Sequence, residues 1–177
     1  MADLSAARVT ADDGIVRLWP PADPGAFRGG LAKLASGVAV VACWADGQPR
    51  GLLVSSLTGL STEPPRLLFC VRKAAAAHGA LLRAEAIGLS LLGSDDREEA
   101  LRFCSSERAA ERFAADRWQL DPHTPPTRVD ALATFTGPVC SRIDAGSHTV
   151  FILDASTAHA RQAPPLLYFE RAFRDLT

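Results

Sequence analysis

The sequence lacks several features that mark particular classes of protein. Its 19 Lys and Arg residues are balanced by 20 Asp and Glu residues, so the formal net charge of −1 gives no electrostatic basis for binding nucleic acid or an anionic membrane. The longest apolar runs have the length of a strand and fall far short of a membrane span. Asp3, Asp12 and Asp13 interrupt the basic-then-apolar order of a secretory signal. We therefore expect a cytoplasmic protein with neither a nucleic-acid nor a membrane partner.

Cysteine and histidine are few and scattered. The four cysteines stand too far apart in the sequence to form a CxxC motif, and the four histidines do not cluster with them. Zinc sites use closely spaced cysteine and histidine ligands, so we predict no metal site. A disulfide framework is not expected in a cytosolic chain of this size. A GxGxxG turn is also missing, so no Rossmann dinucleotide site is indicated.

The most informative stretch that is present is Gly51–Val71, with the sequence GLLVSSLTGLSTEPPRLLFCV. It predicts an apolar strand that ends at Ser55 and Ser56, a short polar loop, and a second apolar strand that follows Pro64 and Pro65. Such an arrangement places hydroxyl groups and free backbone N–H groups at the rim of a β-structure. A rim of this kind suits a flat ligand with polar edges and a phosphate tail.

The hydrophobic pattern predicts short strands with a few helices between them. Asp46-Gly47 is a strong hairpin signal between two apolar runs, and Phe27, Leu31 and Leu34 recur at the spacing of a short helix. Residues 1–26 contain three prolines and are predicted to form an N-terminal arm with one short strand at 15–19. We predict further strands at 38–44, 50–57, 66–71, 87–92, 131–143, 149–159 and 166–173, helices at 74–85, 95–102 and 107–113, and an irregular loop at 118–128.

The predicted strands come in hairpin-like pairs and not as a regular series of βαβ units. This order favours a mainly β, α+β domain built as a small antiparallel barrel with short helices over its ends. It argues against a doubly wound parallel sheet. We place this domain at residues 27–177.

Five segments of the chain carry a family resemblance, in the order FRGGLAKLASGVAVVACW, DGQPRGLLVSSLTGLSTEPP, LLFCVRKAAAAHGAL, AGSHTVFIL and PLLYFERAF. Together they resemble the flavin reductase family, the small partners of two-component flavin monooxygenases, over about residues 27–176. The resemblance implies an antiparallel Greek-key split β-barrel of the FMN-binding type with short peripheral helices. It also implies a homodimer with flavin at its interface, reduction of FMN or FAD by NADH or NADPH, and supply of reduced flavin to a partner monooxygenase.

The same resemblance implies which residues bind the flavin. The segment matched to the isoalloxazine ring and the ribityl chain consists of Leu53, Val54, Ser55 and Ser56. Ser61 matches a serine that precedes the two prolines. The strand end matched to the ribityl phosphate consists of Cys70, Val71, Arg72 and Lys73.

Three further residues are matched to the site. His78 begins the next helix and matches a position near the phosphate, and His148 matches a histidine associated with the nicotinamide cofactor. Tyr168 matches an aromatic residue of the terminal strand. The flavin itself carries the hydride chemistry, so no side chain is predicted to act as a catalytic acid or base. Backbone N–H groups of residues 53–56 would stabilise the negative charge of the reduced ring.

Two departures from the family pattern leave alternatives open. Ala74–Ala77 stand where the family usually has hydroxyl residues, and Ser147 stands where it has an aspartate. These departures keep open a non-catalytic flavin-binding or carrier protein on the same fold, and a diverged enzyme with another small ligand. The marked residues also have ordinary structural roles: serine pairs form turns, and a lone basic pair is often solvated.

Overall fold

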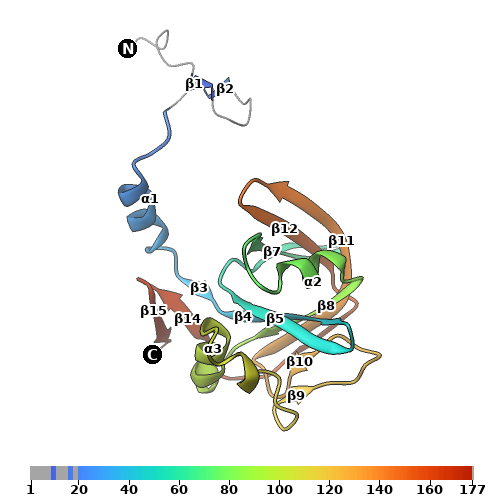
Figure 1. Cartoon of the computed structure of the whole chain (residues 1–177). Helices are drawn as coiled ribbons and strands as arrows, with labels where there is room; N and C mark the ends of the chain where they lie inside the picture. Colours follow the sequence, from blue (N-terminus) through green and yellow to red (C-terminus); the bar gives the residue numbers. More distant parts are fainter. Residues whose placement is uncertain (1–8, 11–15, 18–19, 177) are drawn as a thin grey trace. The chain divides into compact units, whose positions relative to one another are not determined.

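The computed structural model describes residues 9–10, 16–17 and 20–176. The chain divides into two compact units, residues 1–34 and residues 35–177. In the first unit, β1 (Val9–Thr10) pairs with β2 (Val16–Arg17), and α1 spans Pro24–Leu31 (Figure 1). Part of the strand predicted at 15–19 is therefore present, and residues 15, 18 and 19 lie outside the described residues. The division into an arm of 1–26 and a domain of 27–177 stays a prediction.

Helix α1 begins three residues before the predicted start at Phe27. The Oδ1 atom of Asp23 accepts a hydrogen bond of 2.8 Å from the backbone N–H of Ala26, and Pro24 takes the first helical position, where its missing N–H costs nothing. These two residues start the helix ahead of its apolar stripe. Phe27 and Leu31 in that stripe are exposed.

The second unit is built on an antiparallel sheet with the strand order β5-β4-β8-β11-β12-β7-β6. The order begins at β5 and ends at β6, and these two strands are not paired, so the sheet is not closed (Figure 1). The predicted mainly β, antiparallel architecture is confirmed. Its strands are β4 (Ala39–Ala45), β5 (Gln48–Val54), β6 (Thr58–Thr62), β7 (Pro65–Arg72), β8 (Ala86–Leu91), β11 (Ala133–Ala145), β12 (His148–Asp154) and β13 (Thr157–Ala160).

The hairpin of β4 and β5 sets which backbone groups face the open edge. Its turn residues Asp46 and Gly47 have φ angles of 52° and 70°, the positive values of a type I′ turn, and the predicted hairpin is confirmed. Ala45 pairs with Gln48 at the turn, so the ladder bonds to β4 alternate along β5 from that pair. Pro49, which has no N–H, and Leu53 both fall at positions that face away from β4. The N–H of Leu53 therefore points to the unpaired edge.

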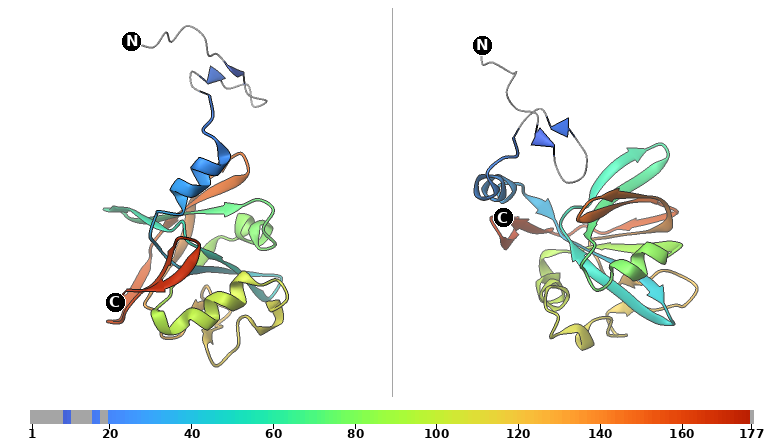
Figure 2. Two further views of the ribbon diagram at one scale, coloured as in Figure 1. Left: turned by 90° about the vertical axis from the view of Figure 1, so that its left-hand side faces the viewer. Right: turned by 45° about the horizontal axis from the view of Figure 1, so that its top comes forward.

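Strand β4 is buried on both faces and divides the core in two. Val41 and its neighbours on one face pack with Leu81 of α2 (His78–Arg83). Val40 and its neighbours on the other face pack with Phe103 of α3 (Arg97–Cys104). Figure 2 shows these two helices on opposite sides of the β4–β5 hairpin. The alternating side chains of one apolar strand thus hold a helix on each side of the sheet.

Strand β11 is long because it serves both halves of the sheet. Residues 133–138 pair with β8 on one edge, residues 133–136 pair with β13 on the other, and residues 139–145 pair with β12. Gly137 lies at the changeover, where an added Cβ would stand 1.9 Å from the carbonyl oxygen of Asp154. Only glycine allows this close approach of backbone to backbone, and the partner strand predicted at 149–159 is accordingly broken into β12 and β13.

Several predicted elements have other bounds or another structure. The loop predicted before the two prolines contains β6, whose residues are all exposed and so carry no hydrophobic alternation. The predicted loop at 118–128 is bounded by a small pair of strands, and the predicted last strand is a hairpin that turns at Glu170 and Arg171, which have positive φ angles. The remaining short strands are β3 (Ser36–Gly37), β9 (Trp118–Gln119), β10 (Thr127–Arg128), β14 (Leu166–Phe169) and β15 (Ala172–Asp175). The 3-10 turns are η2 (Ser94–Asp96) and η3 (Ala109–Glu111).

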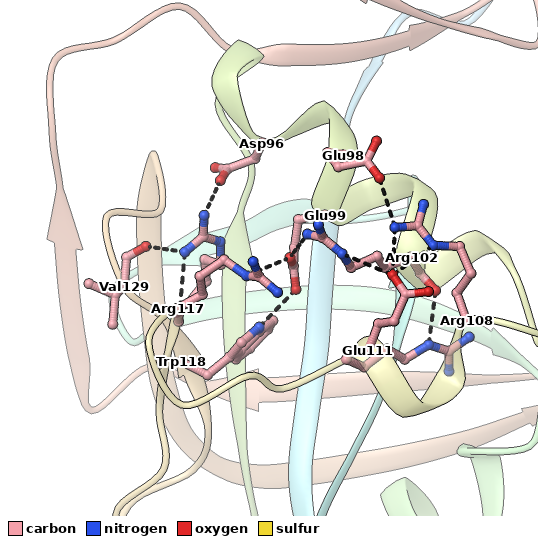
Figure 3. Close-up of polar contacts among 11 residues, drawn as sticks. Asp96, Glu98, Glu99, Arg102, Arg108, Glu111, Arg117, Trp118 and Val129 are labelled. Atoms are coloured by element: carbon pink, nitrogen blue, oxygen red, sulfur yellow. Dashed lines mark hydrogen bonds and ion pairs between the residues drawn. The ribbon is translucent and has the colours of Figure 1, made fainter.

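Helix α3 is anchored to the domain by a buried carboxylate. Glu99 is 2% exposed and accepts hydrogen bonds of 2.8 Å from the indole N–H of Trp118 and 2.8 Å from Nη1 of Arg102. The Nε atom of Arg117 lies 3.5 Å from Oε2 of Glu99. Figure 3 shows this cluster, with the ion pair of Arg108 and the exposed Glu98 beside it. A buried charge is tolerated when it is paired and hydrogen-bonded in this way.

We expect the change Glu99→Gln to lower the free energy of unfolding by about 3 kcal/mol, because it removes the buried negative charge that Arg102 and Arg117 share. The matched control is Glu98→Gln on the same helix, where the carboxylate is 58% exposed; that change should cost less than about 0.5 kcal/mol. Chemical denaturation followed by fluorescence measures both values. Equal losses for the two variants would contradict the anchoring role of Glu99.

Candidate functional site

A hollow of about 720 Å³ opens where β5 and β7 end. Its walls come from four parts of the domain: the end of β5 with the following loop, the end of β7 with the segment after it, the end of α3, and the start of β12. The lining residues are Leu52, Leu53, Val54, Ser55, Ser56, Cys70, Val71, Arg72, Ala74, Ala75, Phe103, Cys104 and His148. The structure thus brings together eight of the twelve predicted site residues.

One wall of the hollow crosses the open seam of the sheet. The Ser56 hydroxyl donates a hydrogen bond of 3.1 Å to the carbonyl oxygen of Cys70 and accepts one of 3.0 Å from the N–H of Cys70. The side chain of Ser56 therefore stands where a neighbouring strand would otherwise pair with β7. Its hydroxyl is used to join β5 to β7, so Ser56 offers the hollow mainly its backbone.

Unpaired backbone donors line the same wall. The N–H groups of Ser55 and Ser56 have no acceptor among the residues that the structure describes. The Ser55 hydroxyl also has no partner within the described part of the chain, and the N–H of Leu53 faces the same edge by its register. Unsatisfied N–H groups at a concave surface are available to donate hydrogen bonds to a ligand. They suit a ligand edge that carries carbonyl oxygens or negative charge.

A cation stands at the rim of the hollow. Arg72 is exposed and lines the hollow, and its guanidinium group forms no hydrogen bond or ion pair with any described residue. The N–H of Ala74, also in the lining, has no acceptor among those residues. A free guanidinium beside a free N–H is a suitable partner for a phosphate group. Ala74 and Ala75 add no hydroxyl groups to this rim.

Lys73 is directed elsewhere. Its Nζ atom lies 2.7 Å from Oδ2 of Asp144, and its backbone N–H donates to the carbonyl oxygen of Ser147 at 3.0 Å. The hydrogen bond from Lys73, together with one from the N–H of Gly146, holds the pKa of Asp144 below its usual value. Lys73 therefore braces the turn between β11 and β12, and it does not line the hollow.

The two predicted histidines lie in different surroundings. His148 lines the hollow, and its Nδ1 atom is 2.9 Å from the hydroxyl oxygen of Ser147. His78 is half-buried, and its Nε2 atom is 2.9 Å from the hydroxyl oxygen of Thr149. The ring of His78 also meets the edge of Phe151. The structure thus brings His148 to the hollow and leaves His78 outside its lining.

The remaining two predicted residues lie outside the main hollow. The Ser61 hydroxyl on β6 donates to the carbonyl oxygen of Pro64. Tyr168 lines a smaller neighbouring hollow of about 220 Å³, which shares Leu53, Val54, Ser55 and Cys104 with the main one. Tyr168 is therefore next to the predicted flavin site rather than in its wall. The binding roles of all twelve residues stay predictions.

Sequence reasoning missed the wall that α3 supplies. Phe103 and Cys104 line the hollow, although about a third of the domain's sequence lies between them and β5. The Phe103 ring packs with Phe113 and Trp118 at centroid distances of 5.2 and 5.5 Å. An apolar residue near a helix end signals burial only, and no local pattern says which surface it completes.

Comparison with known proteins identifies this combination of fold and hollow. A family model described as the flavin reductase like domain matches residues 31–177. The chain belongs to this family. The predicted membership is confirmed, the split-barrel fold class agrees with that of flavin reductase structures, and the protein is an oxidoreductase.

Three similar proteins illustrate the family. FMN reductase (NADH) RutF of Methylorubrum extorquens is 33% identical over 157 residues, which are 88% of this chain and 77% of that protein. The reductase component of 4-nitrophenol 4-monooxygenase/4-nitrocatechol 2-monooxygenase from Rhodococcus opacus is 31% identical over 86% of this chain and 81% of its own length. The crystal structure of BorF, the flavin reductase component of a bacterial two-component tryptophan halogenase, has a TM-score of 0.78 at 33% identity and covers 87% of this chain and 98% of that chain.

Among the described residues of this flavin reductase family member, no helix is both long and apolar enough to cross a membrane. The expected cytoplasmic location stays a prediction.

The change Ser56→Ala should lower the free energy of unfolding by about 1 kcal/mol, because it removes both hydrogen bonds across the seam. It should also weaken flavin binding, since the wall at β5 loses its link to β7. Ser55→Ala is the matched control for stability, because that hydroxyl has no partner among the described residues. Denaturation and flavin titration test both variants. If Ser56→Ala kept the stability and the flavin affinity of the original protein, the seam would hold without this link.

Proposed function

We propose that this protein is an NADH-dependent flavin reductase that passes hydride to FMN or FAD and releases the reduced flavin to a partner monooxygenase. The observation that carries the proposal is the hollow itself, where free N–H groups of Ser55 and Ser56 face a cavity with the unpaired Arg72 at its rim. The names of the similar proteins support NADH as donor and a monooxygenase as recipient.

The residues of the hollow fit a bound flavin. The N–H groups of Ser55 and Ser56 would donate to the N1–C2=O edge of the ring, where negative charge builds on reduction. Arg72 and the N–H of Ala74 would hold the ribityl phosphate. Phe103 supplies apolar surface against the ring system. These assignments use Ser55, Ser56 and Arg72 of the predicted set and add Ala74 and the wall formed by α3.

The flavin supplies the redox chemistry, and the chain supplies binding, orientation and electrostatics. The lining of the hollow contains no Asp, Glu or Lys, and hydride transfer requires no such acid or base. His148, steadied by Ser147, stands where it could meet the nicotinamide cofactor. Few charged contacts hold the ligand, and such modest binding favours release of the reduced flavin.

We propose that the protein is a homodimer. Apolar side chains remain exposed on the second unit, among them Leu60 at 46%, Ile143 at 50% and Tyr168 at 36%. Tyr168 lies beside the hollow, so a second copy packed there would also cover the site. We also propose that the protein acts in the cytoplasm, where reduced nicotinamide cofactor is available. Sedimentation of the purified protein tests the dimer.

The direct test mixes the purified protein with NADH and either FMN or FAD, and follows the loss of nicotinamide absorbance. We expect flavin-dependent oxidation of NADH that greatly exceeds the rate without protein. Flavin binding in titrations with no oxidation of either NADH or NADPH would favour the alternative of a non-catalytic flavin carrier. The hydroxyl-free rim at Ala74 and Ala75 is the observation that motivates this alternative.

The change Arg72→Gln should raise the dissociation constant for FMN about tenfold and leave that for riboflavin unchanged, because riboflavin lacks the phosphate. Lys73→Gln is the matched control, since Lys73 is paired with Asp144 and should affect neither ligand. Fluorescence titration measures all four values. If Arg72→Gln weakened the binding of FMN and of riboflavin equally, Arg72 would not be the residue that binds the phosphate.

A further inference from the structure

A second hollow of about 230 Å³ follows the first along the edge of β5. Arg50 and Gly51 of β5 form one wall, and Ala76 with Ala77 forms another. Arg112 and Phe113, which follow η3, close it on a third side. None of the twelve predicted site residues lines this hollow, and its chemistry is not used in the proposed hydride transfer.

The two hollows adjoin each other on all three walls. Arg50 and Gly51 run directly into Leu52 on β5, and Ala75 of the first hollow is followed by Ala76 of the second. On the third side the rings of Phe103 and Phe113 meet edge to face, with centroids 5.2 Å apart. A ligand that fills the first hollow and extends past Ala75 therefore enters the second.

The close approach of Phe113 to β5 shapes the second hollow. An added Cβ at Gly51 would lie 2.9 Å from Cζ of Phe113 and 2.6 Å from the carbonyl oxygen of Val41. Only glycine lets the aromatic ring lie directly on the strand. This contact presents an aromatic ring at the hollow, a surface on which a flat heterocycle can stack.

The charges of the second hollow favour an anion. Arg50 is exposed, and its side chain has no hydrogen-bonding or ionic partner among the described residues. Arg112 is held in place because its guanidinium donates to the carbonyl oxygens of Arg102, Phe103 and Ser105 at 3.0, 3.3 and 2.7 Å. No Asp or Glu lines either hollow. With Arg72 at the first hollow, the two hollows are lined by three arginines and by no carboxylate.

We propose that the second hollow binds the adenosine phosphate half of FAD, so that Arg50 makes FAD the preferred flavin. The proposal rests on the proposed function, which places the ribityl phosphate at Arg72. The second phosphate of FAD then meets Arg50 and Arg112, and the adenine ring meets Phe113. FMN ends at its single phosphate and leaves the second hollow empty.

The test compares Arg50→Gln with the unchanged protein in equilibrium titrations of FAD and FMN. We expect the dissociation constant for FAD to rise about tenfold and that for FMN to stay within about twofold, as loss of one charge-assisted contact to phosphate predicts. Arg174→Gln on β15 is the matched control, because it removes one exposed arginine away from both hollows. Equal effects on FAD and FMN would overturn the proposal.

Adenosine 5′-monophosphate is the second probe, because it carries the adenosine phosphate group without a flavin. A kinetic measurement then tells FAD from the nicotinamide cofactor as the source of that group. We expect it to compete with FAD and not with FMN, and to lose affinity in Arg50→Gln. In assays with FMN, a raised KM for NADH in Arg50→Gln would assign the hollow to the nicotinamide cofactor and overturn the FAD proposal. The titrations need no turnover, so a protein that binds FAD selectively but does not oxidise NADH would fail the proposed function and not this one.

Discussion

The open seam between β5 and β7 is the constraint on which the site depends. A closed sheet would pair the outward N–H of Leu53 with a neighbouring strand and leave no donors for a ligand. In this chain the edge of β5 stays unpaired, and the hydroxyl of Ser56 bridges to Cys70 instead. The seam is thus held together by a side chain, and backbone donors of the next residues remain available at the hollow. A ligand that supplies acceptors there completes the hydrogen bonding that the sheet leaves unfinished.

The far wall of the hollow depends on a different interaction. Helix α3 must be held firmly against the outer face of β4, because its last residues face the ligand. Apolar packing of Phe103 accounts for part of this, and the buried carboxylate of Glu99 ties the helix to Trp118 and Arg117. Charge is used here for orientation: α3 and the start of β9 meet at one carboxylate, which Arg102 of the same helix also contacts. These hydrogen bonds and ion pairs offset the desolvation of Glu99.

The distribution of paired and unpaired arginines separates structure from binding. Arg102 and Arg117 share the carboxylate of Glu99, Arg102 also lies near Glu111, and Arg128 is paired with Asp96. Arg50 and Arg72 at the two hollows have no counter-charge among the described residues. In a protein with a net charge of −1, such local excess of positive charge arises from placement alone. It is the property that a phosphate-bearing ligand would recognise.

Much of the fold was predictable because its signals are local. The Asp46-Gly47 turn needs positive φ angles, and the alternating apolar side chains of β4 pack into two cores. Both properties depend only on residues that are adjacent in the sequence. The resemblance also picked out residues 53–56 and 70–72, and the structure brings them together.

The sequence could not show that β6 is a strand, since all its residues are exposed. Nor could it show that Lys73 forms an ion pair whereas the Arg72 side chain stays unpaired, because the partner of Lys73 is Asp144, which is distant in the sequence. Nor could it show that Phe103, Phe113 and Arg112 close the hollows, because their positions follow from how α3 packs on β4. Strand identity and turn type depend on neighbours along the chain, whereas a binding wall depends on which surfaces meet, and only the tertiary structure decides that.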